Sequence, residues 1–502
     1  MSTMDFVLQR LQLANQQITS DIIKDLIKDH APIRTEMLRK YNAYKASGLP
    51  ISSREAAGSN KANNKLINDF RGEIVDQVVG YIFGNPVTYS LNTDDIKNPE
   101  ADPSYKRNLT IIKDFKTLNK LEELDGETGK FMSICGRAAR LLYIDRNGKE
   151  RVMDVPPWEC IFIYDQSLNE VQYALRYYYV YEVVNGSTEV RTRVEWYDDN
   201  SVYYFLSSAT GYMLDNQFQT VSSDLNAASS QFHLFDRVPL IDFQNNKECQ
   251  GDFEKTESLI DGYDRLISDA QNEIEDFRQA YLLFYGVHPN EEALEKAKST
   301  GAFGADKDDK IEYLTKNIND QFVENQKKSL RENIYRFSKT VDVSADTFTG
   351  SGASGEARKW LLLALENRGS RLALKFKSGA AKMFEVIASA WKKKGITIDP
   401  NQIDIAVDRN LPVELKMEAE IQSMLKGVVS DRTRLKLFSP VRDVDEELKQ
   451  IDKENELKVD LDDVPDDDDG DEDNPQKAAD AQMVKDGKMT QADFDTKHGV
   501  KA

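Results

Sequence analysis

The sequence contains few of the residues that usually build metal or redox sites. Among 502 residues there are three cysteines and four histidines. Cys135, Cys160 and Cys249 are widely spaced and odd in number, which argues against a disulfide framework and indicates a reducing compartment. The histidines form no i, i+4 pair and have no Cys-x-x-Cys partner, so we expect neither a metal site nor a cofactor.

Signatures of hydrolases and of membrane proteins are also missing. There is no G-x-x-x-x-G-K-[ST] loop and no G-x-S-x-G turn, which disfavours an NTPase and a serine hydrolase. No apolar run approaches the roughly 18 residues of a membrane span. The first residues have neither the basic nor the apolar region of a secretory signal. We therefore expect a protein that is not an enzyme and does not contact a membrane.

Acidic residues are concentrated in one late segment. The net charge is −20, and residues 443–473 alone hold 17 acidic and 3 basic residues. The rest of the chain is therefore close to balanced. An aspartate-rich stretch repels itself and has few apolar residues to bury, so we expect residues 457–502 to form an acidic, disordered tail.

Hydrophobic patterning predicts an α+β, mainly helical fold. Residues 1–50 show amphipathic helical spacing, and strand candidates rich in aromatic and β-branched residues follow up to about residue 250. Asn-Gly turns after Arg146 and Val184 predict antiparallel hairpins. The strand candidates are Leu141–Asp145, Cys160–Tyr164, Tyr173–Tyr181, Val190–Tyr197 and Ser201–Phe205.

From residue 260 onward, apolar side chains recur at steps of three and four residues. This period predicts a long helix whose seam packs against other helices. A two-stranded coiled coil is one interpretation, but aromatic residues in the seam fit a larger helical assembly better. A compact segment at 286–316 and a returning helix at Asp320–Val341 complete a helical hairpin. The seam residues are Ile260, Tyr263, Ile267, Ala270, Ile274, Phe277, Tyr281 and Phe284.

A loop rich in glycine and hydroxyl groups, Asp346–Gly355, separates this hairpin from the next helix. Its G-x-G-x-x-G spacing could indicate a dinucleotide site, but such a site needs a preceding strand in a βαβ unit, which the helical surroundings do not provide. A plain linker is a second interpretation. Its position between two helices favours a functional loop. The candidate residues are Asp346, Thr347, Phe348, Thr349, Gly350, Ser351, Gly352 and Ser354.

An 11-residue apolar period after the loop predicts a nearly straight helix of about 40 residues. Gly369-Ser370 and Ser378-Gly379 are its expected kink points. A strand at Ile403–Val407 follows, and then helices from Glu414 to about Glu456.

Basic residues flank the loop on both sides. A solvated helix face is the simplest interpretation, and a weakly positive surface beside a polyanion such as DNA is the alternative. On the preceding helix these residues are Lys327, Lys328, Arg331, Arg336 and Lys339. On the following helix they are Arg358, Lys359, Arg368, Arg371, Lys375 and Lys377.

Six short segments carry a family resemblance. They are Tyr81–Val87 (YIFGNPV), Ala174–Tyr178, Arg237–Asn246 (RVPLIDFQNN), Ser354–Ala357, Leu425–Ser430 and Asp443–Leu448. In this order and spacing, over about residues 20–460, the chain resembles the portal proteins of tailed double-stranded-DNA bacteriophages, of the type found in long-tailed phages of Gram-positive hosts.

The resemblance implies a ring of twelve copies at one capsid vertex, with double-stranded DNA passing along its axis. It also implies contacts with the terminase large subunit, a head-completion adaptor, and the major capsid and scaffolding proteins. The implied location is the virion, after assembly in the host cytoplasm. The implied parts are a wing (1–250), stem helix 1 (251–285), a clip (286–316), stem helix 2 (317–343), a tunnel loop (344–355), a long helix and return strand of the wing (356–409), a crown (410–456) and the tail (457–502).

Two other functions stay open on the sequence alone. A coiled-coil scaffold or adaptor without a channel would form elongated dimers. A nucleotide-binding enzyme using Gly350–Gly355 would bind NAD or ATP. The loop has few charges around Thr347-Phe348-Thr349. The family resemblance therefore does not predict how this loop would contact DNA.

Overall fold

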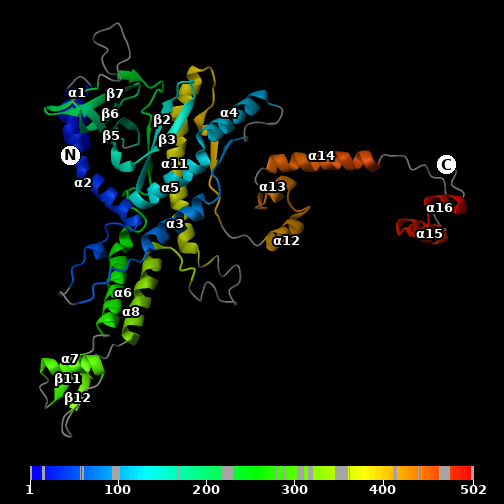
Figure 1. The fold of residues 1–502 in the computed structure, drawn as a ribbon. Coiled ribbons are helices and arrows are strands. Elements are labelled where there is room, and N and C mark those ends of the chain that lie inside the picture. Colours follow the sequence, from blue (N-terminus) through cyan, green and yellow to red (C-terminus); the bar gives the residue numbers. More distant parts are fainter. Residues whose placement is uncertain are drawn as a thin grey trace. The chain divides into compact units, whose positions relative to one another are not determined.

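The computed structural model divides the chain into two units, Met1–Leu411 and Pro412–Ala502, which are described separately (Figure 1). The described residues are 3–13, 17–56, 58, 61–92, 102–167, 169–184, 186–215, 230–277, 281–285, 290–301, 310–314, 320–344, 360, 362–410, 415–438, 440–441, 444–462 and 475–498.

A six-stranded antiparallel sheet forms one layer of the first unit. Its strand order is β4-β5-β6-β7-β8, with β9 also paired to β7. Helices α1 (Thr3–Leu13) and α2 (Ser20–Tyr44) pack on the sheet, where Ile23 of α2 is buried with Tyr177 and Trp196. The strands are β4 (Cys160–Tyr164), β5 (Val171–Val184), β6 (Ser187–Tyr197), β7 (Ser201–Ser208), β8 (Gly211–Leu214) and β9 (Ser230–Phe232). The predicted strands and their antiparallel pairing are confirmed.

The largest core surrounds α11 (Leu363–Lys393), which packs on a three-stranded sheet of order β10-β2-β3. The β2–β3 turn places Gly148 at φ +73°, as the predicted Asn-Gly turn requires. The other elements around this core are α3 (Phe70–Phe83), β1 (Thr88–Leu91), α4 (Pro103–Asn119), α5 (Leu121–Cys135), β2 (Arg137–Ile144), β3 (Glu150–Val155), β10 (Leu240–Gln244) and β13 (Ile403–Ala406), which pairs with β1.

Two glycines at the predicted kink points allow α11 to pack closely against its neighbours. α11 is helical without interruption through Gly369 and Gly379. A Cβ atom on Gly369 would lie 2.4 Å from Ile82, and one on Gly379 would lie 2.4 Å from Phe243. Any larger residue at either position would therefore force α11 away from its neighbours.

Two helices, α6 (Glu257–Phe277) and α8 (Asp320–Ser338), form the predicted helical hairpin. Between them along the chain lie β11 (Tyr281–Tyr285), α7 (Glu291–Thr300) and β12 (Lys310–Leu314), and β11 pairs with β12 (Figure 1). The expected continuation of the first helix through Tyr281 and Phe284 is wrong. Residues 281–285 read YLLFY, and in a short, wholly apolar run a helical period cannot be told from a strand.

The second unit contains five helices among its described residues. They are α12 (Leu415–Leu425), α13 (Asp431–Lys436), α14 (Val444–Asp462), α15 (Pro475–Lys485) and α16 (Gln491–His498). The prediction of a tail disordered throughout 457–502 is wrong, because α14 continues to Asp462 and α15 and α16 are helical. Lys497 pairs with the buried Asp480 at 2.7 Å, and the Thr490 side chain caps α16, so these short helices have specific polar contacts.

Candidate functional site

The first half of the α6 seam is buried inside the subunit. Ile260 and Tyr263 lie in a cluster with Phe70 of α3 and with Ile334 and Tyr335 of α8. The Phe70 ring meets the Tyr263 ring edge-on at a centroid distance of 5.0 Å. Ile267, one of the predicted seam residues, is half-buried and packs on the same cluster. This part of the predicted seam therefore stabilises the hairpin and its attachment to α3.

The second half of the hairpin leaves large apolar side chains exposed. Ile274 is 53% exposed on α6, and Phe322 is 58% exposed on α8. Phe337, which is 54% exposed, lies at the opposite end of α8, where it lines the cavity described below. The predicted seam residue Phe277 is the last residue of α6, and Tyr281 belongs to β11; the side chains of both lie outside the described part of the structure. The structure thus separates the predicted seam into an internal part and an uncovered part.

An extended segment of the chain lies along the polar side of α6. Three side chains of α6, four residues apart, accept hydrogen bonds from backbone N–H groups two residues apart in residues 64–68. Four residues of a helix and two residues of an extended chain each cover about 6 Å. One extended segment can therefore donate to all three acceptors in turn. The pairs are Asn68–Asp264, Leu66–Ser268 and Asn64–Asn272, with N···O distances of 2.9, 3.0 and 2.7 Å.

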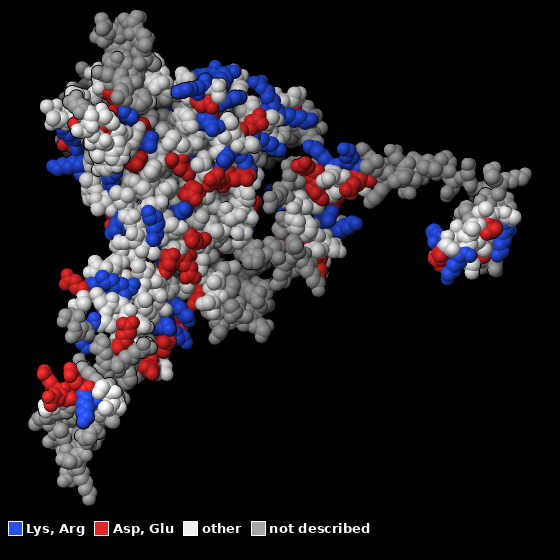
Figure 2. Space-filling model, in the orientation of Figure 1, with Lys and Arg blue, Asp and Glu red and all other residues white. Residues whose placement is uncertain are grey.

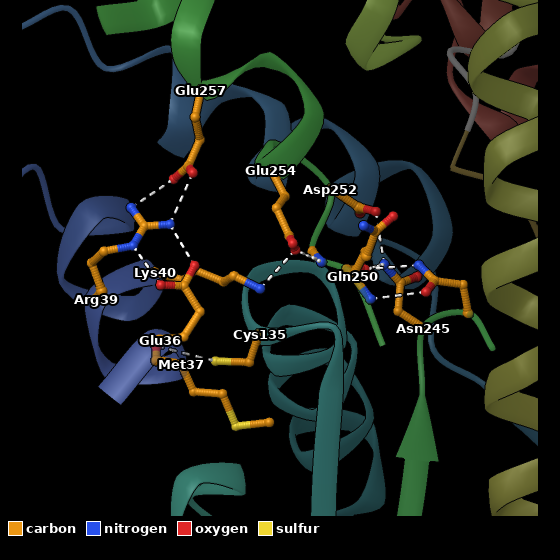
Figure 3. Close-up of polar contacts among 12 residues, drawn as sticks. Glu36, Met37, Arg39, Lys40, Cys135, Asn245, Gln250, Asp252, Glu254 and Glu257 are labelled. Atoms are coloured by element: carbon orange, nitrogen blue, oxygen red, sulfur yellow. Dashed lines mark hydrogen bonds and ion pairs between the residues drawn. The ribbon is translucent and has the colours of Figure 1, made fainter. Parts of the chain in front are cut away.

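The junction between β10 and α6 is organised around the carboxylate of Asp252 (Figure 3). Ser133 of α5 donates to one carboxylate oxygen at 2.6 Å, and Asn245 donates to the other at 2.9 Å. Arg368 of α11 forms an ion pair with it at 2.6 Å and also donates to the backbone carbonyls of Asp252 and Ser338. One buried carboxylate therefore connects α5, the end of β10 and α11, and Arg368 extends the connection to the end of α8.

A second set of ion pairs joins the same junction to α2 (Figure 3). Lys40 pairs with Glu254 at 2.6 Å, and Arg39 binds both Glu36 and Glu257. Hydrogen bonding by Arg39 is the main cause of a lowered pKa at Glu36. These contacts fix the first turn of α6 to α2.

Close backbone approach at this junction requires glycine at two positions. Gly136 has φ +80°, and a Cβ atom there would lie 2.0 Å from the carbonyl oxygen of Cys249. A Cβ atom on Gly251 would lie 2.3 Å from the carbonyl oxygen of Ile134. Residues 249–251 therefore lie directly against the end of α5, and no other residue type fits there.

The predicted loop Asp346–Gly355 lies outside the described residues, but the chain that leads into it is held in place. Gln77 of α3 donates to the carbonyl of Val341 at 2.8 Å and accepts from its N–H at 3.0 Å. Asp342 pairs with Arg331 at 3.3 Å. The end of α8 is therefore fixed to α3 immediately before the loop.

The five predicted basic residues of α8 and its end do not form one free positive surface. Three of them have carboxylate partners: Lys327 with Glu324, Lys328 with Glu332, and Arg331 with Asp342. Arg336 is exposed, with its guanidinium 5.8 Å from the Phe337 ring centroid. Lys339 is exposed and lines a cavity.

This cavity, of about 180 Å³, lies where α8, α11 and the β10–α6 junction meet. Its basic residues come from three separate parts of the chain. The lining residues are Asn245, Asn246, Glu248, Gln250, Gly251, Asp252, Lys255, Phe337, Ser338, Lys339, Arg368, Arg371 and Leu372. Lys339, Arg368 and Arg371 are among the predicted basic residues, but no pattern in the sequence brings them together with Lys255.

The described residues offer few candidates for metal binding or thiol chemistry. No group of three or more possible metal ligands occurs among them. The three cysteines are free, and burial raises the pKa of Cys135 to about 12, so this thiol stays protonated and unreactive at neutral pH.

Comparisons with known proteins give a consistent result. A family model described as phage portal protein, SPP1 Gp6-like, matches residues 23–459. The chain belongs to this family. The portal protein of Bacillus phage SPP1 is 25% identical over 489 residues, covering 91% of this chain and 92% of the relative. The portal protein of Clostridium phage phiCD119 is 24% identical over 472 residues, covering 87% and 96%. The predicted family is therefore confirmed.

Family membership makes this chain a phage portal-family protein, a structural class of virion capsid component rather than a known enzyme class. None of the helices in the described ranges combines the length and the apolar character that crossing a bilayer requires. The family match ends at residue 459, before α15 and α16.

Proposed function

We propose that copies of this chain form a closed ring of twelve at one vertex of a phage capsid, and that viral double-stranded DNA passes through the ring during packaging and ejection. The observation that carries this proposal is the family match over residues 23–459. The exposed apolar side chains of Ile274 and Phe322 on the second half of the hairpin support it, because a neighbouring copy could cover them. Head-to-tail contacts between different faces of identical copies produce closed rings.

The parts of the chain have distinct roles in this proposal. Helices α6 and α8 form the stem, and residues 286–316 form a clip that docks the terminase large subunit and later the head-completion adaptor. The region 1–250, with the long helix, forms a wing that contacts the major capsid and scaffolding proteins. Residues 410–456 form a crown, and residues 344–355 line the channel.

Imaging of the purified full-length chain tests the ring directly. We expect closed rings by electron microscopy and a twelve-subunit mass by native mass spectrometry. Monomers and elongated dimers alone at micromolar concentration would contradict the proposal and favour a coiled-coil scaffold. Binding of NAD or ATP would instead favour the nucleotide-binding alternative.

Substitution of the loop is expected to affect DNA passage without affecting assembly. Phe348→Ala removes an aromatic contact that can act on any DNA sequence, so rings should form while packaged or retained DNA decreases. Thr347→Lys combined with Thr349→Lys should slow translocation, most clearly at low salt, because each added cation strengthens phosphate binding. Each variant is supplied to a phage that lacks its own portal gene. The DNA content per particle then measures how much DNA is packaged and retained.

The matched control for this experiment is Phe232→Ala, because Phe232 is a 75% exposed phenylalanine on β9. It should package DNA normally. If the loop variants also package and retain DNA at the normal rate, the loop is only a linker.

A further inference from the structure

The cavity at the junction of α8, α11 and the β10–α6 segment has an excess of positive charge. Lys255, Lys339, Arg368 and Arg371 line it, against the carboxylates of Glu248 and Asp252. Asp252 is already bound by Arg368, Ser133 and Asn245. Among the described residues, no carboxylate pairs with Lys255, Lys339 or Arg371. Three cations therefore face this space without a carboxylate partner in that part of the chain.

These cations lie close enough to influence one another. The pKa of Lys339 is lowered by partial burial and then by the charges of Arg371, Arg368 and Lys255. Phe337 and Leu372 contribute apolar side chains to the lining. Cations that repel each other at one place are stabilised by an anion bound between them.

Lys339 has a backbone conformation that it shares with four other non-glycine residues among those described. Lys339 follows the last residue of α8 and has φ +60°. The left-handed conformation at this position favours glycine or asparagine, and any other residue type loses stability there. Glycine at position 339 would therefore suit the backbone while removing the cation.

The second cavity of the first unit provides a comparison. It has a volume of about 230 Å³ and lies between β10, α11 and the loop before β5. Its Arg237 is bound by Glu170 and Glu385, and its Lys382 donates to the carbonyl of Asn169. Acidic residues outnumber basic ones in its lining. A basic excess is therefore not a general property of the concave surfaces of this protein.

The surface charge of the first unit also differs from that of the cavity. Figure 2 shows blue and red side chains interspersed over much of the face in view, with basic residues gathered mainly over α4 and the end of α11. The cavity cations are distinguished by their convergence on one solvent-open space from three separate segments of the chain.

We propose that this cavity binds a phosphate group through Lys255, Lys339 and Arg371, with Arg368 held in place by Asp252. The cavity is large enough, because a single water needs only about 10–15 Å³ of such volume. Arginine and lysine are the usual donors to phosphate oxygens. The phosphate comes either from the DNA backbone or from free phosphate. The DNA source rests on the proposed portal function, whereas phosphate binding itself does not.

The test measures binding of inorganic phosphate to the full-length protein by isothermal titration calorimetry at low ionic strength. The first variant is Lys339→Gly, which removes the cation and gives the left-handed position the residue type that suits it. The second is Lys255→Gln combined with Arg371→Gln. The control is Lys28→Gln, because Lys28 is an exposed lysine on α2 outside the cavity. Thermal unfolding of each protein verifies its fold.

We expect phosphate to bind the wild type and the control equally well. Loss of one charged donor should weaken binding about tenfold. Lys339→Gly should unfold at a temperature no lower than the wild type, so weaker binding by this variant cannot be attributed to misfolding. Phosphate binding that is absent in the wild type, or unchanged in both cavity variants, would overturn the proposal.

A second titration identifies the source of the phosphate. A fluorescent DNA duplex is titrated with each protein at several salt concentrations. If the DNA backbone supplies the phosphate, the salt dependence should decrease by about one counterion per removed cation, and inorganic phosphate should compete. If free phosphate is the ligand, the duplex titrations of variants and wild type coincide. Rings without phosphate binding would contradict the cavity proposal alone, and phosphate binding by monomers would contradict the portal proposal alone.

Discussion

Replacement of Arg140 by methionine is expected to destabilise the first unit by about 3–5 kcal/mol, because it leaves the buried Asp125 and the partly buried Asp154 without their cation. Arg140 is fully buried on β2 and pairs with Asp125 at 2.8 Å and with Asp154 at 3.3 Å. Its guanidinium also lies 5.0 Å from the centroid of the Phe243 ring. Urea unfolding followed by tryptophan fluorescence measures the loss, since Trp158, Trp196, Trp360 and Trp391 all belong to this unit.

The decrease in the free energy of unfolding caused by Arg140→Met should be smaller at pH 5 than at pH 7. Burial already raises the pKa of Asp125 and of Asp154, and Arg140 opposes this rise. Without Arg140 both folded-state pKa values increase further above the unfolded value, so the folded state binds more protons and gains stability as the pH falls. The control is Arg237→Met, a half-exposed arginine whose two ion pairs lie at the surface and should contribute about 0–1 kcal/mol. If Arg140→Met and Arg237→Met lowered the free energy of unfolding equally, the stabilising role of the buried Arg140 ion pairs would be contradicted.

Ile274→Asp is expected to abolish ring formation while leaving the fold of the subunit unchanged. Ile274 is half-exposed, so the charge is solvated in the single subunit but would be buried without a partner at a contact between copies. Burial of an unpaired charge costs several kcal/mol, and in a ring the loss is repeated at every contact. Native mass spectrometry should show monomers, with a tryptophan unfolding curve that matches the wild type.

Leu118→Asp is the matched control, because Leu118 is an exposed aliphatic residue on α4, outside the hairpin. It should still form rings. Substitution of Ile267 is a poorer test, since Ile267 packs against the core of its own subunit and its loss would confuse folding with assembly. Rings formed by Ile274→Asp would show that the exposed half of α6 does not contact a neighbouring copy.

Local patterns in the sequence predicted most of the elements in the described residues. Strand β4 occupies the predicted range Cys160–Tyr164, because alternating aromatic and β-branched residues end at clear turn signals. The α6–α8 hairpin also follows from its apolar period. The apolar period gave the wrong element at β11, where apolar residues are continuous. The prediction of a disordered tail was based on its acidic charge and missed two short helices.

The candidate site was much less predictable, since its residues are distant in the sequence. Arg368 was identified as one of several basic residues on a helix, but its partner Asp252 lies 116 positions earlier and has no motif. The left-handed backbone of Lys339 likewise has no signature, since lysine is not the residue expected there. Such contacts depend on how helices cross, which short-range patterns do not specify.

The Asp252 carboxylate and the Arg368 guanidinium determine how the subunit can move. Arg368 binds Ser338 at the end of α8 and Asp252 just before α6, so tilting the helical hairpin against α11 would break all of these contacts together. The hairpin and α11 should therefore move as one rigid body. If the copies form a ring, any change in the width of its channel must come from sliding or rotation between neighbouring copies, and not from bending within one copy.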